Sequence, residues 1–193
     1  MNFWETLITF VVGFLGKRPK ELLEVSIPLG NSPSEEVRPE APPKIENMPS
    51  AIDWTNKDMQ VTDHFTVGDC LTLHAWNRLA TEADGVTDDA KAYMVELCQK
   101  MEKIRTILGC PMNVHCIYRS PEYNTKVVGA IANDVHSLGQ AIDFDCNGHH
   151  TIDEVHAILE PLLEQNGLRM ERNTNTWIHL DIHPVKNARY FTV

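Results

Sequence analysis

The chain has 193 residues, of which 42% are hydrophobic and 23% are charged, a composition typical of a soluble globular protein with one domain and an appendage. The formal net charge is −10, with no visible stripe of lysines and arginines. We therefore expect no nucleic acid partner, because binding one requires clustered cations that neutralise phosphates. Five cysteines at irregular spacing, with no C-x-x-C pair, argue against a disulfide framework and a thiolate zinc site, but they leave one bridged pair open.

Residues 1–27 form an apolar or amphipathic N-terminal segment whose apolar run covers 3–16. That run is shorter than the roughly 20 apolar residues that span a membrane, and Glu5 interrupts it. Basic residues follow the run and none precedes it, which is the reverse of the order in a cleavable secretory signal. We expect a helix that lies on a membrane surface or docks on a partner protein. A weak membrane anchor and a helix packed on the domain are the alternatives.

Residues 28–50 have the composition of an extended linker. Six prolines in this stretch prevent a helix, and the glutamates between them prevent a buried core. The globular domain is therefore expected at 51–193.

Two helices are predicted to open this domain. Thr66 and Asp69 have the spacing of a capping box, which predicts a helix that continues through Leu79. A second helix is expected to begin at Thr87, since apolar residues recur every three or four positions until Gly109 ends the pattern. We interpret these apolar stripes as core faces.

The second half of the domain is predicted to combine short strands with one longer helix. Strands are expected over 112–118, 141–146, 168–170 and 177–182, a helical turn over 122–127, and a helix capped by Thr151 and closed by Gly167. Helices followed by a small antiparallel sheet with one crossing helix indicate an α+β domain in which helices flank the sheet.

Two histidines and a carboxylate carry the strongest chemical signal. His136 lies on a predicted loop seven residues before Asp143, which lies in a predicted strand, and His179 lies in the last predicted strand. Gly139 permits a tight turn between the first two. If they converge, three such side chains form a zinc site with a fourth position free for water, as in catalytic rather than structural zinc sites. The helical H-E-x-x-H motif is absent, which argues against the common zincins.

Four fragments resemble one group of zinc peptidases in their order and spacing. They are YRSPEYN at 118–124, VGA at 128–130, HSLGQAID at 136–143 and WIHLD at 177–181. The sequence is similar to the zinc D-Ala-D-Ala carboxypeptidases and phage endolysin peptidases, which form one superfamily with lysostaphin and the hedgehog signalling domain. The resemblance implies the α+β fold of that superfamily.

The resemblance also implies roles for individual residues. His136, Asp143 and His179 would bind Zn²⁺. Arg119 would hold the substrate carbonyl and the developing oxyanion, because a fixed guanidinium stabilises charge that appears in the transition state. Tyr123 is expected to fix the loop that presents Arg119 and to contribute to substrate binding.

Three positions depart from the family pattern. Many relatives carry a glutamate three residues before the last zinc histidine or a histidine two residues before it, whereas this chain has Thr176 and Trp177 there. Asp134 stands where relatives usually have serine, and it adds charge near the metal. The identity of the general base is therefore open.

Three side chains are candidates for the base. Asp181 shares a strand face with His179, which also suits an acceptor that orients a ligand histidine. Glu171 qualifies if the turn at 173–176 folds it back over the metal, and His183 continues the same strand face. We expect the catalytic group to include Arg119, Asp181 and Glu171.

These features predict a zinc-dependent peptidase that hydrolyses an amide bond involving a D-amino acid in the peptidoglycan stem peptide. Without a clear cleavable signal, it would stay in the cytoplasm until release through a holin, belong to a virion, or be weakly anchored to the membrane while acting on the cell wall. One alternative is a catalytically impaired zinc module for cell-wall recognition or virion or envelope assembly. A third hypothesis makes residues 1–50 the functional part, as a docking segment. The sequence distinguishes neither D,D-carboxypeptidase from endopeptidase nor one oligomeric state from another.

Overall fold

The computed structural model describes residues 52–126 and 134–192 of the chain. The expectations for 1–27 and 28–50 concern residues outside these ranges and stay predictions. Within the described ranges, no helix is both long and apolar enough to span a membrane.

The first described helix is short. The predicted capping box is present, because the Thr66 side chain accepts a hydrogen bond from the Asp69 amide and the Asp69 carboxylate accepts one from the Thr66 amide. Helix α1 (Val67–Leu71) follows this cap and buries one side in the core.

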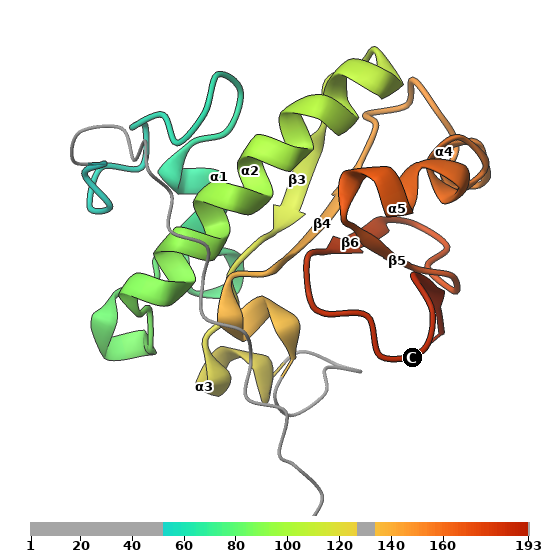
Figure 1. The fold of residues 1–193 in the computed structure, drawn as a ribbon. Helices are drawn as coiled ribbons and strands as arrows, with labels where there is room; N and C mark the ends of the chain where they lie inside the picture. The colour runs from blue at the N-terminus through green and yellow to red at the C-terminus, as the bar shows by residue number, and fades with distance from the viewer. Residues whose placement is uncertain (1–51, 127–133, 193) are drawn as a thin grey trace, which may run out of the picture. The chain divides into compact units, whose positions relative to one another are not determined.

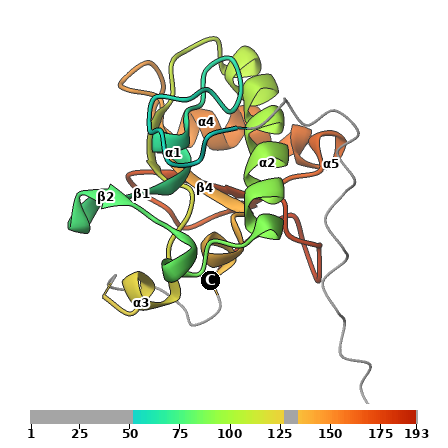
Figure 2. The ribbon, with the colours of Figure 1, turned by 90° about the vertical axis from the view of Figure 1, so that its left-hand side faces the viewer.

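The predicted continuation of this helix through Leu79 is wrong, because the chain turns into a two-stranded hairpin. Asn77 adopts a left-handed backbone with φ of 49°, which asparagine tolerates and which ends right-handed structure. The hairpin consists of β1 (Thr72–Leu73), the 3₁₀ turn η1 (His74–Trp76) and β2 (Arg78–Leu79). Figure 2 shows this hairpin extending away from α2, above α3.

Helix α2 (Asp88–Leu108) confirms the second predicted helix at both ends. The Thr87 side chain accepts a hydrogen bond from the Ala90 amide, and Gly109 ends the helix with a left-handed φ of 65°. A short 3₁₀ turn, η2 (Glu82–Asp84), precedes it. The helix crosses the main sheet, as Figure 1 shows.

The main sheet has five strands in the order β3-β4-β6-β5-β7. Its strands are β3 (Asn113–Cys116), β4 (Ala141–Asp145), β5 (Arg169–Glu171), β6 (Ile178–Asp181) and β7 (Tyr190–Phe191). All neighbours pair antiparallel except β5 and β7, which are parallel. The four predicted strands are confirmed, whereas β7 was not predicted.

Short helical segments connect these strands. They are α3 (Pro121–Asn124), η3 (Val135–Leu138), α4 (Ile152–Leu159), η4 (Glu160–Leu162) and α5 (Leu163–Asn166). The Thr151 cap and the Gly167 terminus confirm the predicted ends of the crossing helix. Its middle is a 3₁₀ turn, because Pro161 has no N–H to donate to the preceding turn.

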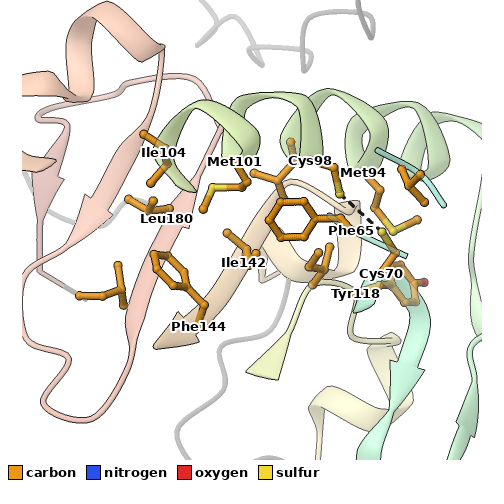
Figure 3. Packing of buried hydrophobic residues seen from close by; sticks show 14 of the residues in the cluster. Phe65, Cys70, Met94, Cys98, Met101, Ile104, Tyr118, Ile142, Phe144 and Leu180 are labelled. Atoms are coloured by element: carbon orange, nitrogen blue, oxygen red, sulfur yellow. Dashed lines mark hydrogen bonds between the residues drawn. The ribbon is translucent and has the colours of Figure 1, made fainter. Parts of the chain in front are cut away.

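The two faces of the main sheet have different surroundings. Ile142, Phe144 and Leu180 are fully buried and point toward Met101 and Ile104 of α2, as Figure 3 shows. Because strand side chains alternate, Asp143, His179 and Asp181 lie on the opposite face. The predicted α+β class, with helices flanking a small antiparallel sheet, is confirmed.

The cysteines are free thiols in this fold. Cys70 and Cys98 are buried, and their thiols form a hydrogen bond with the sulfurs 3.7 Å apart (Figure 3).

Candidate metal centre

The three predicted ligands converge on one point. His136 Nε2 lies 3.3 Å from His179 Nδ1 and 3.3 Å from Asp143 Oδ1, and the latter two atoms are 2.8 Å apart. Residues from a 3₁₀ turn and two adjacent strands thus form a triangle of one carboxylate oxygen and two ring nitrogens.

The size of this triangle fits zinc. Zinc bonds to histidine nitrogen and carboxylate oxygen are about 2.0–2.2 Å long, so two ligand atoms of a regular zinc tetrahedron lie roughly 3.3 Å apart. Two edges of the observed triangle have this length, and the third is about half an ångström shorter. Three protein ligands would occupy three corners and leave the fourth to solvent or substrate.

Local backbone geometry places His136. The Asp134 side chain caps η3 by accepting a hydrogen bond from the His136 amide at 3.0 Å. Gly139 ends the turn with φ of 71°, and a Cβ there would lie 2.6 Å from the Ala90 carbonyl oxygen in α2. The prediction that Gly139 permits the turn between the first two ligands is therefore confirmed, and close contact with α2 adds a second requirement for glycine.

A backbone carbonyl fixes the ring of His136. Nδ1 donates to the Ile117 carbonyl oxygen at 2.8 Å, and the ring is fully buried. With Nδ1 protonated, the lone pair of Nε2 is directed into the triangle, as a metal ligand requires.

Sheet pairing places the other two ligands. Asp143 on β4 and His179 on β6 are cross-strand partners, so their side chains lie on the same face. Burial lowers the pKa of His179, but hydrogen bonds to Asp143 and Asp181 outweigh burial and raise it to about 10. Burial raises the pKa of Asp143, but the neighbouring charge of His136 and bonds to both histidines reverse this and hold it well below its usual range. The negative carboxylate favours a cation at this position.

Asp181 lies beside the triangle but is unsuited to be the general base. It is fully buried, and Arg169 donates to its Oδ1 at 2.7 Å and to its Oδ2 at 2.9 Å. Oδ1 also accepts the His183 amide, and Oδ2 faces His179 Nε2 at 3.5 Å. A carboxylate with these partners orients the ring of His179. This is the second role that the sequence suggested for Asp181.

Glu171 occupies a different environment. Continuing the β5–β6 register from Arg169 opposite Asp181 places Glu171 opposite His179. The residue is half-buried, and no other described residue forms a hydrogen bond or ion pair with its carboxylate. The β5–β6 register thus places Glu171 beside His179, and its approach to the metal position stays a prediction.

Arg119 and Asp134 form an ion pair next to His136. Arg119 Nη2 donates to Asp134 Oδ2 at 2.6 Å, and the two side chains are only 14% and 12% exposed. Arg119 Nε is buried and has no hydrogen-bond partner among the described residues. The carboxylate at 134 therefore links the arginine to the amide of a candidate ligand.

Tyr123 and His183 have other partners. The Tyr123 hydroxyl accepts a hydrogen bond from the Ala75 amide at 3.1 Å, and its ring packs edge-on against Trp76. These contacts attach α3 to the hairpin, in line with the expected role in fixing the Arg119 loop; a substrate contact of Tyr123 stays a prediction. His183 Nδ1 lies 2.7 Å from Gln140 Oε1, and burial lowers the pKa of His183.

Sequence reasoning missed two residues around the ligands. Arg169 could have been found, because antiparallel pairing of the last two predicted strands places a basic residue near Asp181. Phe191 gave no usable signal, since β7 has only two residues and follows an irregular segment.

Comparisons with known proteins agree with this geometry. A family model described as peptidase M15 matches residues 71–181, more than half of the chain, and this range contains the ligand triangle, Arg119 and Glu171. Searches of curated proteins and of solved structures gave no match. The match and the motifs that preceded it show that this chain belongs to the peptidase M15 family, the group of zinc D-Ala-D-Ala carboxypeptidase-like peptidases.

Proposed function

We propose that this protein is a zinc-dependent peptidase that hydrolyses an amide bond involving a D-amino acid in the peptide of peptidoglycan. The observation that carries the proposal is the triangle of His136, Asp143 and His179, in which two edges of 3.3 Å match those of a zinc tetrahedron. Membership of the peptidase M15 family supports the substrate class.

Zinc at this position would supply Lewis acidity, which polarises a carbonyl and makes water nucleophilic near neutral pH. The chain itself must supply proton transfer and must stabilise the negative charge on the carbonyl oxygen. Glu171 and Arg119 are our candidates for these two roles.

Glu171 is proposed as the general base and acid. Its carboxylate lies at the register position opposite His179 and is free of other described partners. It could take a proton from the attacking water and return it to the leaving amine, which must be protonated for the amide to cleave. The two bonds that Asp181 accepts from Arg169 support Glu171 over Asp181 in this role.

Arg119 is proposed to bind the substrate carbonyl oxygen. The pair with Asp134 fixes the guanidinium, while its buried Nε lacks a described partner. The interaction would strengthen as negative charge develops on that oxygen.

The proposal places the site of action at the cell wall, which the protein would reach after holin-dependent release, from a virion, or from a weak membrane anchor. The test is incubation of the zinc-loaded protein with cross-linked muropeptides, followed by mass spectrometry of the products. Free D-alanine would identify a carboxypeptidase, and conversion of cross-linked dimers to monomers would identify an endopeptidase. A chelator should stop the reaction, and added zinc should restore it.

Two matched variants test the base. We expect Glu171→Gln to lower kcat by roughly a hundredfold or more with zinc content unchanged, whereas Glu164→Gln, an exposed glutamate on α5, should keep full activity. If the zinc-loaded wild type digests no peptidoglycan, the catalytically impaired binding module replaces the peptidase as the better description.

A further inference from the structure

We propose that Arg169, Asp181 and Phe191 form a clamp that holds the ligand His179 in its metal-binding orientation. The inference rests on the metal centre of the proposed function and adds positioning residues to it. Two of the three residues come from strands β5 and β6, and the third comes from the C-terminal strand β7.

The first half of the clamp is a buried ion pair. The planar guanidinium of Arg169 binds both oxygens of Asp181, at 2.7 and 2.9 Å, and so fixes the plane of the carboxylate. In this orientation Asp181 Oδ2 faces His179 Nε2 at 3.5 Å. Asp181 is fully buried and the Arg169 side chain is only 13% exposed, so water competes little for these bonds.

The second half of the clamp is the aromatic ring of Phe191, which contacts both Arg169 and His179. The Arg169 guanidinium lies over Phe191, 4.8 Å from the ring centroid. The same ring meets His179 edge-on, with centroids 6.3 Å apart and an interplanar angle of 89°. Phe191 therefore packs against the ligand and against the cation that holds Asp181.

The orientation of His179 matters because it offers Nδ1, not Nε2, to the triangle. A half-turn of the ring about its Cβ–Cγ bond would replace Nδ1 by a carbon atom and abolish that ligand. The acceptor at Nε2 and the ring of Phe191 both oppose this rotation. Such outer partners of a ligand histidine typically contribute 10–100-fold in metal affinity.

The clamp extends beyond the region matched by the family model, which ends at Asp181. Strand β7 lies outside that region and pairs parallel with β5, with Phe191 opposite Glu171. We infer that this C-terminal strand completes the metal centre of this chain.

The test is the zinc affinity of the full chain, measured by competition with a chromophoric chelator. Arg169→Met should weaken zinc binding about 10–100-fold. Phe191→Leu should also weaken zinc binding, but by a smaller factor. Arg169→Lys should restore only part of the loss, because a lysine cannot hold both carboxylate oxygens. The matched control is Arg172→Met, which removes a similar stack on β7, 4.2 Å above Tyr190, and should leave the affinity unchanged.

Circular dichroism confirms which variants are folded. Should Arg169→Met fail to fold, the difference between Phe191→Leu and Arg172→Met decides the question. Equal zinc affinity in these folded variants would overturn the clamp alone. A wild-type chain that binds no zinc would overturn the metal centre and the clamp together. If the variants show the expected order of zinc affinities but the zinc-loaded wild type has no peptidase activity, the clamp is supported and the proposed reaction is rejected.

Discussion

The two faces of the main sheet are made by the same strands, but they depend on different physics. On β4, Ile142 and Phe144 are buried under α2, whereas Asp143 between them joins the metal centre. On β6, Leu180 enters the core between His179 and Asp181. Because successive side chains of a strand point to opposite faces, neighbouring residues belong alternately to the packed core and to the charged site.

The two faces should therefore tolerate different kinds of substitution. The core face needs apolar volume, and its contribution is spread over many contacts. The site face needs particular partners, because a buried charge without its partner is costly. Substitutions on the core face should therefore change the free energy of unfolding, and substitutions on the site face should change metal affinity and activity.

Loss of a ligand should have the largest effect. We expect His179→Ala to reduce peptidase activity to background and to weaken zinc binding by more than the 10–100-fold that outer partners cost, since one of three ligands is lost. Metal content and muropeptide turnover measure this, with circular dichroism as the control for folding. Full zinc content in the folded variant would contradict the assignment of His179.

A large core truncation should give the opposite pattern. Phe144→Ala removes a fully buried ring beneath α2 and should lower the free energy of unfolding by about 3–5 kcal/mol. The fraction that remains folded should bind zinc with nearly the wild-type affinity, although Phe144 is adjacent to Asp143. Denaturant titration and chelator competition on the same sample would check both parts. A large drop in affinity would break the separation between the two faces.

The sequence predicted the core face and the ligands better than it predicted their supports. Periodicity and caps identified α2 between Thr87 and Gly109, because these signals are local. The motif spacing predicted that His136, Asp143 and His179 would converge, and the fold brings these three side chains together. The helix expected to reach Leu79 instead ends at Leu71, where Thr72 takes an extended backbone and begins strand β1.

The supports of the site depend on pairing between strands, which a single sequence expresses weakly. Asp181 was a candidate base because it shares a strand face with His179, and only the position of Arg169 on β5 shows that its oxygens are already engaged. Glu171 was a candidate on the condition that a turn folds it over the metal, whereas the β5–β6 register places it opposite His179. Phe191 depends on a two-residue strand that no local pattern predicts.

Gly139 contacts α2 of the core and ends the turn that carries His136, so its substitution should affect both stability and zinc affinity, each by a smaller amount. Its φ of 71° and the 2.6 Å approach of a Cβ to the Ala90 carbonyl mean that Gly139→Ala must shift either α2 or the turn that carries His136. We expect a loss of about 2 kcal/mol or more in the free energy of unfolding together with weaker zinc binding. Gly109→Ala is the matched control, because φ there is 65° but no atom lies within 4 Å of the new Cβ. The control should show a smaller loss of stability and unchanged zinc affinity.

The smallest expected effect concerns a carboxylate that belongs to neither face. Hydrogen bonds from Arg78, at 2.6 and 2.7 Å, hold the pKa of Asp84 well below its usual value, and bonds from Thr81 add to this. Because the folded-state pKa is lowered, the stability from Asp84 is present above pH about 3.8 and is lost as the pH falls toward the folded-state pKa. Asp84→Asn should therefore cost up to about 1 kcal/mol at neutral pH and make acid unfolding less steep, measured by denaturant titration from pH 7 down to about pH 2. Zinc affinity should stay unchanged, and Asp58→Asn, at an exposed position, should change neither quantity. If the loss of stability at low pH is the same in Asp84→Asn as in the wild type, the acid sensitivity of the fold would instead come from the buried carboxylates of the site face.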